Sequence, residues 1–228
     1  MGKSVPKLTI ILTSHRKPKY LKEAIDSVLA QTRKDFTLLI VDSGKGGKEM
    51  KKVLDNLDPK IEVRFTGETA ELKKKIWVCS WVLNQALKTI RTKYVSFLCD
   101  DDLIYPRYVE KMLGMLGGRK KAVYCSENRN IIRGGKDIPY GFNYAGEIKS
   151  SDFNNKVDYL QVMFKTKLLN KLSQPWFSES LDDKNHADGI FLDRLGAITK
   201  FYPVKESLCE NRVTPISVTT GYITKLKI

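Results

Sequence analysis

The chain lacks several features that would place a protein in a familiar class at once. No apolar run in its 228 residues is long enough to span a bilayer, and its first residues, MGKSVP, lack the apolar core of a signal peptide. No G-x-G-x-x-G or P-loop pattern is present, so a dehydrogenase or a P-loop nucleotide hydrolase has little support.

Cysteine is scarce, and the cysteines are not spaced in pairs. The four cysteines sit in apolar segments and do not have the spacing of metal ligands; they are Cys79, Cys99, Cys125 and Cys209. We expect them to be small, reduced core residues, and this usage indicates a cytoplasmic protein.

Positive charge, in contrast, is in excess. Forty Lys and Arg residues against 26 acids give a formal net charge of +14, which predicts attraction to nucleic acid, an anionic membrane face or phosphorylated substrates. Most of the lysines are scattered and are typical of a solvated surface. No zinc-finger, helix-turn-helix or RNA-binding pattern accompanies them, so no specific nucleic-acid partner is expected. Peripheral membrane contact through the basic residues stays an open expectation.

The hydrophobic pattern alternates between strand and helix. Apolar runs predict buried strands over residues 7–13 and 36–41, and a strand over residues 94–99. A further short strand is expected over residues 61–65. Helices are expected between them, from Pro18, over residues 48–57 and over residues 76–90, the last apolar nearly all round. This alternation predicts βαβ units and a mainly parallel sheet in one domain.

Three segments far apart in the sequence follow predicted strands directly. Turns come after Thr13 and after Val41, and three consecutive carboxylates, Asp100, Asp101 and Asp102, come after the fourth strand. Because ligands of open α/β sheets bind at the carboxyl ends of the strands, we expect the three segments to meet at one crevice.

The acid triplet itself suggests a cation site. Like charges this close repel, and Mg²⁺ or Mn²⁺ is typically held by one or two carboxylates together with substrate phosphates. The alternative is that the acids cap a helix that begins near Pro106, although one acid would suffice for that.

The motifs LTIILTSHRKPKYLKEAIDSVLAQT, FTLLIVDSG and YVSFLCDDDLIYP together resemble the nucleotide-sugar half of inverting family 2 glycosyltransferases with the GT-A fold, most closely those of spore-coat polysaccharide synthesis. The resemblance implies an α/β domain over residues 1–228, with a Rossmann-like nucleotide-sugar half at about 7–103 and a smaller acceptor half at about 104–228. It also implies a nucleotide-sugar-dependent transferase of the hexosyltransferase type with a divalent cation, Mn²⁺ or Mg²⁺.

Site residues carry over by position. Thr13 and His15 match residues that line the base and ribose, although His15 also reads as a loop residue that caps the next helix. Lys73 matches an arginine that reaches the diphosphate, and it equally suits a solvated lysine triplet. Asp42 and Ser43 match an acid pair near the base. The serine replaces an acid, which leaves the base uncertain although UDP- or dTDP-sugars are the expected donors.

The acid triplet allows two registers. Alignment on Ile104-Tyr105-Pro106 puts Cys99 at the first acid of the family's D-x-D site, so Asp100 contacts ribose and Asp101 binds the metal. Asp102 is then a supporting residue or the helix cap. The rival register gives the metal to Asp102.

The second half of the sequence has fewer patterns from which structure can be predicted. A strand over residues 122–133 leads into a hairpin at Gly134-Gly135, a polar loop is expected over residues 140–155, and a helix over residues 164–172. Asp188 matches the family's catalytic base at a helix start, with His186, Asp182 and Asp183 as fallbacks. Asn185 and Asp188 also resemble a helix-capping arrangement.

The implied reaction is displacement at the anomeric carbon with inversion, in which Asp188 takes the proton from a hydroxyl of a glycan or other acceptor. Because no covalent intermediate is needed, no Ser–His or Cys–His dyad is expected, and none is found. A non-catalytic sugar-nucleotide-binding protein, a polyanion-binding module and a metal-dependent nucleotidyltransferase remain as alternatives.

Overall fold

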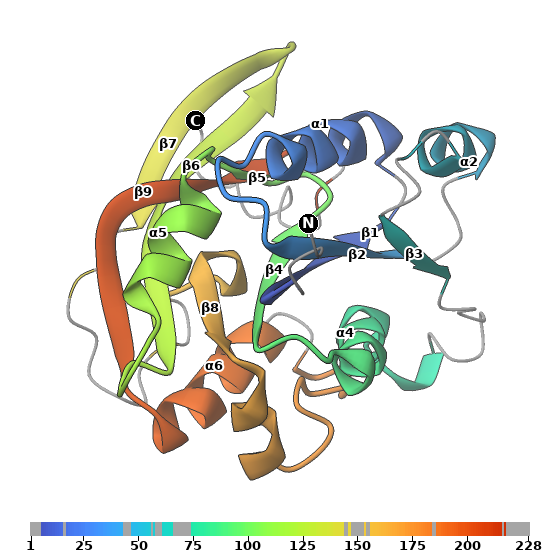
Figure 1. Ribbon diagram of the computed structural model, residues 1–228. Helices are drawn as coiled ribbons and strands as arrows, with labels where there is room; N and C mark the ends of the chain where they lie inside the picture. Colours follow the sequence, from blue (N-terminus) through green and yellow to red (C-terminus); the bar gives the residue numbers. More distant parts are fainter. Residues whose placement is uncertain are drawn as a thin grey trace, which may run out of the picture.

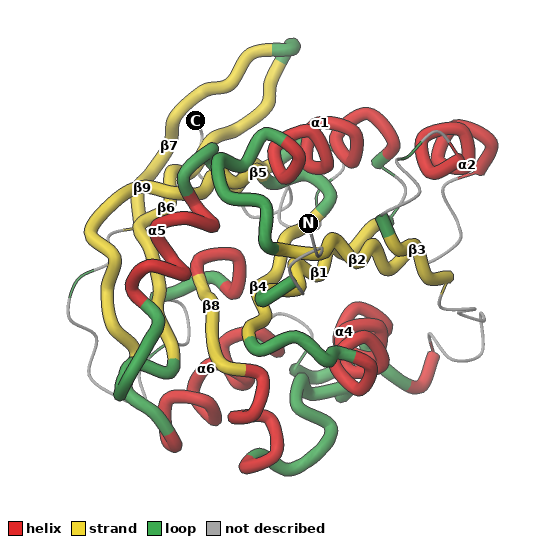
Figure 2. The backbone as a smooth tube through the Cα atoms, in the orientation of Figure 1, coloured by secondary structure: helices red, strands yellow, loops and turns green. Residues whose placement is uncertain are grey.

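A single mixed sheet runs through the described part of the chain (Figures 1 and 2). The computed structural model describes residues 6–15, 17–42, 47–55, 57, 61–65, 74–143, 146, 153, 156–183, 186–215 and 217. Its strands are β1 (Leu8–Ser14), β2 (Phe36–Asp42), β3 (Glu62–Phe65), β4 (Tyr94–Cys99), β5 (Leu103–Ile104), β6 (Ala122–Arg133), β7 (Lys136–Asn143), β8 (Val162–Lys165) and β9 (Phe201–Val213). Its helices are α1 (Pro18–Leu29), α2 (Gly47–Asp55), α4 (Val78–Thr89), α5 (Tyr108–Met115) and α6 (Ala187–Ile198), with short 3₁₀ helices η1 (Tyr159–Gln161) and η2 (Thr166–Lys171).

The first half of the sheet is parallel. Strand β1 pairs with β2 on one side and with β4 on the other, and β2 pairs with β3. Helices α1, α2 and α4 connect these strands and cover both faces, so β1, β2 and β4 are largely apolar and buried. Strand β3, at the end of the sheet, has the exposed Glu62.

The second half mixes directions. Strand β8 lies antiparallel between β4 and β6, and β6 is parallel to β9. A hairpin joins β6 to the outlying β7 at Gly134 and Gly135, whose φ angles of 58° and 75° are the left-handed values that such a turn requires. The predicted mixed α/β architecture with a mostly parallel central sheet is confirmed.

Two cores lie on opposite faces of the sheet. Helices α1 and α5 cover one face, and α4 and α6 cover the other. In the second core the ring of Phe97 on β4 lies 5.5–6.1 Å from the four rings of Tyr159, Phe164, Phe177 and Phe191. This cluster joins residues from both halves of the chain.

A buried glutamine joins α1 to the segment that enters α5. The Gln31 amide donates to the carbonyl of Tyr105 at 2.8 Å and accepts from the backbone N–H of Val109 at 2.9 Å. The Val109 N–H is buried, so the side chain supplies a hydrogen bond that this group would otherwise lack. The Tyr105 carbonyl also accepts from the backbone N–H of Tyr108 at 2.9 Å.

The structure corrects several expectations. Residues 164–172 begin inside β8 and continue as η2, not as an α-helix, and residues 140–143 of the expected loop belong to β7. Helix α4 exposes Cys79 and Lys88, so it is buried on one face only. Cys125 and Cys209 are buried and unbridged as predicted, whereas Cys99 is only partly covered. Among the described residues, no helix is both long and apolar enough to cross a membrane.

Candidate active site

The ends of β1, β2 and β4 meet at one edge of the sheet. The pairing register sets Thr13 beside both Val41 and Cys99, and Ser14 beside Asp42. Thr13 is partly buried and Asp42 is buried, while His15 just beyond β1 is exposed. The predicted convergence of these segments is therefore confirmed, because parallel strands of matched length end together.

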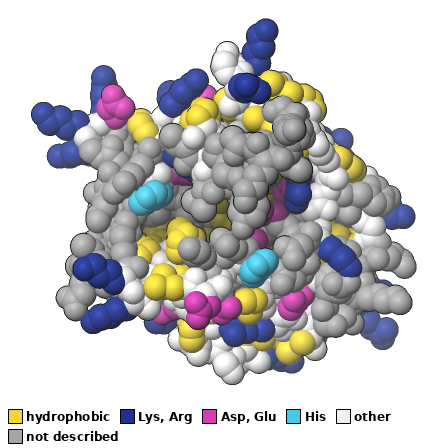
Figure 3. Space-filling view, turned by 180° about the vertical axis from the view of Figure 1, so that it is seen from behind, with side chains coloured by type: hydrophobic (Ala, Val, Ile, Leu, Met, Phe, Trp, Pro, Cys, Tyr) yellow, Lys and Arg dark blue, Asp and Glu magenta, His cyan; other side chains and the backbone are white. Residues whose placement is uncertain are grey.

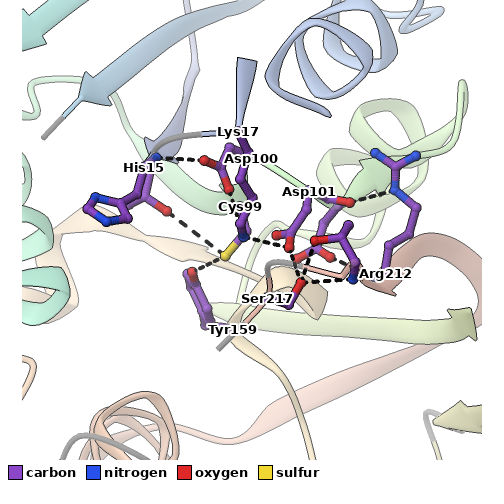
Figure 4. A network of polar contacts seen from close by, with 11 residues as sticks. His15, Lys17, Cys99, Asp100, Asp101, Tyr159, Arg212 and Ser217 are labelled. Atoms are coloured by element: carbon purple, nitrogen blue, oxygen red, sulfur yellow. Dashed lines mark hydrogen bonds and ion pairs between the residues drawn. The ribbon is translucent and has the colours of Figure 1, made fainter. Parts of the chain in front are cut away.

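The three carboxylates of the triplet are buried, and Asp100 and Asp101 share one cationic partner (Figure 4). Asp100 accepts from the backbone N–H of His15 at 2.6 Å, and the Lys17 ammonium lies 3.2 Å from its other oxygen. The same ammonium contacts Asp101 at 2.6 Å, and the Ser217 hydroxyl donates to Asp101 at 2.6 Å. These contacts tie the triplet to the β1 loop and to the segment after β9.

Burial dominates the electrostatics of this site. It raises the pKa of Asp100 to about 6, although the Lys17 charge works in the opposite direction. Burial also raises the pKa of Asp102, with repulsion from Asp101 as the next cause, and it raises the pKa of the Cys99 thiol. A bound cation would favour the ionised form of these acids and would offset the repulsion between Asp101 and Asp102.

The donor atoms fit a divalent cation. The Sγ of Cys99 and carboxylate oxygens of Asp101 and Asp102 all lie within 4.8 Å of one another. Two hard oxygen donors suit Mg²⁺ or Mn²⁺, and substrate phosphate oxygens would complete such a sphere. Tyr159 on η1 holds the thiol through a 2.5 Å contact between its hydroxyl and Sγ.

The helix-cap interpretation of the triplet is wrong. The residue at the N-terminus of α5 is Arg107, and no side chain caps that helix. Asp102 instead accepts from the backbone N–H of Arg212 at 2.8 Å, while the Arg212 Nε donates to the carbonyl oxygen of Asp101 at 2.5 Å. Arg212 also pairs with Glu23 at 2.6 Å, so β9 and α1 together fix the acid loop.

Asp188 lies in the first turn of α6 and is half-buried. Burial raises its pKa, and backbone N–H groups at the start of the helix oppose that shift. The charge of Asp188 raises the pKa of Asp158. The charge of Asp158 in turn raises the pKa of Asp102. Asp158 is therefore electrostatically coupled both to the predicted base and to the acid triplet.

The fallback residues are placed less favourably. His186 is the N-cap residue of α6 without a side-chain capping bond, Asp182 is exposed, and Asp183 accepts from the Ser178 hydroxyl at 2.5 Å within its own loop. Both histidine side chains are visible on the face of the molecule shown in Figure 3.

Two predicted nucleotide contacts, Ser43 and Lys73, lie outside the described residues, as does Asn185. Asn84 is buried in α4. Its side chain accepts from the Phe177 N–H at 3.0 Å and donates to the Phe177 carbonyl and the Glu179 carboxylate at 2.9 Å. Asn84 thus fastens the loop that precedes Asp188.

Sequence reasoning missed five residues that complete the site. They are Lys17, Glu127, Asp158, Tyr159 and Arg212. Lys17 could have been found from its position two residues after His15 at a strand end. The others come from the second half, where no motif marks them.

The fold is that of the GT-A class of glycosyltransferase structures. Residues 9–169 match the model of the family described as Glycosyl transferase family 2, and the chain belongs to that family. The resemblance seen in the three sequence motifs is therefore confirmed.

Particular relatives agree with this membership. Protein CgeD of Bacillus subtilis is 28% identical over 225 residues, which cover 95% of this chain and 52% of that protein. The O-antigen biosynthesis glycosyltransferase WbnJ of Escherichia coli is 28% identical over 175 residues, covering 72% of this chain and 63% of that protein. The chain thus spans only part of the length of the curated relatives it matches, about half in the case of CgeD.

Solved structures show the same fold at lower identity. The mannosyltransferase PcManGT from Pyrobaculum calidifontis, in complex with GDP-Man and Mn²⁺, has a TM-score of 0.62 and 13% identity, covering 98% of this chain and 61% of that one. S. aureus TarS in complex with UDP-GlcNAc has a TM-score of 0.63 and 15% identity, covering 91% of this chain and 58% of that one.

Proposed function

We propose that this chain transfers a sugar from a nucleoside-diphosphate sugar to an acceptor hydroxyl, with inversion at the anomeric carbon. The observation that carries the proposal is the buried acid triplet at the sheet edge, where Cys99 Sγ and carboxylate oxygens of Asp101 and Asp102 lie within 4.8 Å of one another. A further acid, Asp188, lies in the first turn of α6. One acidic centre suits a cation and diphosphate, and the other suits proton removal, which are the two needs of this reaction.

The nucleotide would lie along the ends of β1, β2 and β4. Thr13, His15, Asp42 and Ser43 would line the base and ribose, with Asp100 on the ribose and Lys73 on the diphosphate. The confirmed position of Thr13, Asp42 and Cys99 at one edge supports this arrangement.

Asp101 and Asp102 would hold the divalent cation, with the Cys99 thiol beside it. A bound cation supplies stabilisation for the charge that grows on the departing diphosphate. The donor atoms within 4.8 Å of one another support this role. Because Lys17 already contacts Asp101, we expect its ammonium to shift toward the phosphates when the site is loaded.

Asp188 would accept the proton from the attacking hydroxyl. Its raised pKa makes it a better base than an ordinary aspartate, and the helix start fixes the direction of its carboxylate. Both features support catalysis and are compatible with a contribution to helix stability.

UDP- and dTDP-sugars are the donors we favour, and Mn²⁺ or Mg²⁺ the cation. The complexes of TarS with UDP-GlcNAc and of PcManGT with GDP-Man and Mn²⁺ indicate which donors to test first. The acceptor would be a glycan or another hydroxyl compound.

The experiment is calorimetric titration of UDP, dTDP, GDP and their sugars with and without Mn²⁺, followed by NMR of the product anomer. We expect cation-dependent binding of one nucleotide and a product of inverted configuration. Absence of binding to every nucleotide with Mn²⁺ present, or a retained configuration, contradicts the proposal.

A non-catalytic sugar-nucleotide-binding protein is the second candidate. The contact of Lys17 with Asp101 favours it, because the ammonium lies on a carboxylate that the cation would need. Cation-independent binding without turnover of any donor would support this candidate over the first.

We also propose peripheral contact with an anionic membrane. Lys93, Lys121 and Lys165 lie close together, because the backbone N–H of Lys165 donates to the carbonyl of Lys121 at 2.8 Å and that of Thr166 donates to the carbonyl of Lys93 at 3.0 Å. Sedimentation with vesicles that contain phosphatidylserine should show binding that weakens with salt, and equal binding to neutral vesicles contradicts the idea.

A further inference from the structure

The short helix η1 connects three parts of the site. Tyr159 contacts Cys99 at the end of β4, and the Gln161 amide donates to the carbonyl of Cys125 on β6 at 2.6 Å. The same glutamine accepts from Asn143 on β7 at 2.9 Å. Asp158 caps this helix by accepting from the backbone N–H of Leu160 at 2.8 Å. Asp158 is therefore held against β6 and β7.

Glu127 lies on β6 where this strand contacts η1. It follows Cys125 by two residues and is paired in register with Asn143, and both of those residues bond to Gln161. Its charge raises the pKa of Asp158, and the charge of Asp188 raises the pKa of Glu127 itself, after the larger effect of burial. Glu127 thus lies on a third element and is electrostatically coupled to the two carboxylates.

The Glu127 carboxylate is only half satisfied. The residue is 0% exposed, and its Oε1 accepts from the Nε of Arg129 at 2.8 Å. Its Oε2 is buried and has no hydrogen-bond partner among the described residues. An unsatisfied buried charged oxygen is costly, and a purely structural ion pair with Arg129 would gain nothing from leaving it so.

We propose that Oε2 of Glu127 accepts a hydrogen bond from a sugar hydroxyl of the substrate held beside Asp188. The inference rests on the proposed transferase function and adds a specificity-determining residue to it. A carboxylate oxygen only accepts hydrogen bonds, so the group that completes it must be a donor such as a hydroxyl. A substrate without that hydroxyl would leave the oxygen unpaired and would be discriminated against.

The hydroxyl could belong to the donor sugar or to the acceptor, and the experiment separates these sources. The variants are Glu127→Gln and Glu127→Ala, and the matched control is Glu206→Gln, an exposed glutamate on β9 that pairs with Lys111 at 2.6 Å. Thermal unfolding of each variant first establishes that it is folded. The probes are the nucleoside diphosphate and nucleotide sugar that the wild-type protein binds with Mn²⁺, deoxy analogues of that sugar, and glycerol as a small hydroxyl acceptor.

We expect the nucleoside diphosphate alone to bind wild type and variants with equal affinity. For a donor-sugar hydroxyl, one deoxy analogue binds the wild type about 10-fold to 100-fold more weakly, the range for a hydrogen bond to a charged group, and Glu127→Ala removes that difference. For an acceptor hydroxyl, the ratio of transfer to glycerol over donor hydrolysis falls by about 10-fold or more in the variants only.

The inference is overturned if neither difference appears, or if the affinity for the nucleoside diphosphate falls as much as that for the sugar. Failure of the wild-type protein to bind any nucleotide is a different result, because it removes the proposed function itself.

Discussion

The two halves of the sheet build their parts of the site in different ways. In the first half, the polar residues directly follow parallel strands that end at the same level, so neighbours in space share a simple position in the sequence. In the second half, Glu127 lies in the middle of a strand, Asp158 at a 3₁₀ helix and Asp188 in a helical turn. The comparison teaches that the position of the proposed nucleotide site follows from the topology of the sheet. The position of the proposed base, Asp188, depends instead on side-chain packing.

The largest expected effect separates the two halves by function. Asp188→Asn should lower the transfer rate by about 10²-fold to 10⁴-fold, the usual contribution of a general base, and should leave nucleotide binding intact. Asp101→Asn, in the first half, should instead weaken cation-dependent nucleotide binding. Steady-state rates and calorimetry measure the two effects. If both variants lost nucleotide binding equally, the proposed division of function between the two halves would be wrong.

Removal of the shared aromatic core tests whether the halves fold as one unit. Phe97→Ala should lower the free energy of unfolding by about 3–5 kcal/mol, because a buried ring is lost among four others. Urea unfolding should keep one transition by fluorescence and circular dichroism. Two separate transitions would mean that the halves are independently stable.

A smaller loss is expected within one core. Gln31→Leu should lower the free energy of unfolding by about 2 kcal/mol, because the buried N–H of Val109 loses its partner. Lys22→Ala, which removes an exposed ion pair with Asp26, serves as control and should change stability by less than about 1 kcal/mol. Equal effects of the two substitutions would contradict the role of Gln31.

The pH dependence of the transfer rate should report the protonation of Asp188, which lies in the second half of the chain. Burial raises the pKa of Asp188 above the ordinary aspartate value, and the charge of His186 opposes that shift. Asp188 in turn raises the pKa of Asp158 and of Glu127. As pH falls through that raised pKa the base becomes protonated, so the rate should fall about tenfold per pH unit below it. The sign for stability is opposite, because a raised pKa contributes stability at low pH that is lost as pH rises through it. A pH–rate profile without an acidic limb would contradict the assignment.

The smallest effect concerns the cation. Cys99→Asp replaces a soft sulfur with a hard oxygen and should shift the ratio of Mg²⁺ to Mn²⁺ affinity toward Mg²⁺ by less than about tenfold. Calorimetric titration of each metal measures the ratio, and Cys79→Ser, at an exposed cysteine, is the control. An unchanged ratio would indicate that the thiol does not contribute to cation binding.

The same contrast explains what the sequence could predict. Apolar runs gave the parallel strands and their ends, and hence the placement of Thr13, Asp42 and the acid triplet, because those depend on local pattern and on sheet geometry. The segment at residues 164–172 was misjudged as a helix because a short apolar run does not distinguish strand from helix. Arg212 reaches the triplet from more than a hundred residues away, and no local pattern carries that information.

The glycine turn between β6 and β7 has a practical consequence. The hairpin extends away from the rest of the molecule (Figure 1), its tip is exposed at Gly134 and Gly135, and a Cβ added at either glycine would meet no atom within 4 Å. Exposed tips of this kind tolerate inserted peptides. A fluorophore or an affinity tag spliced in there would sit on the strand that carries Glu127, so the protein can be immobilised or followed optically without blocking the edge where its substrates would bind.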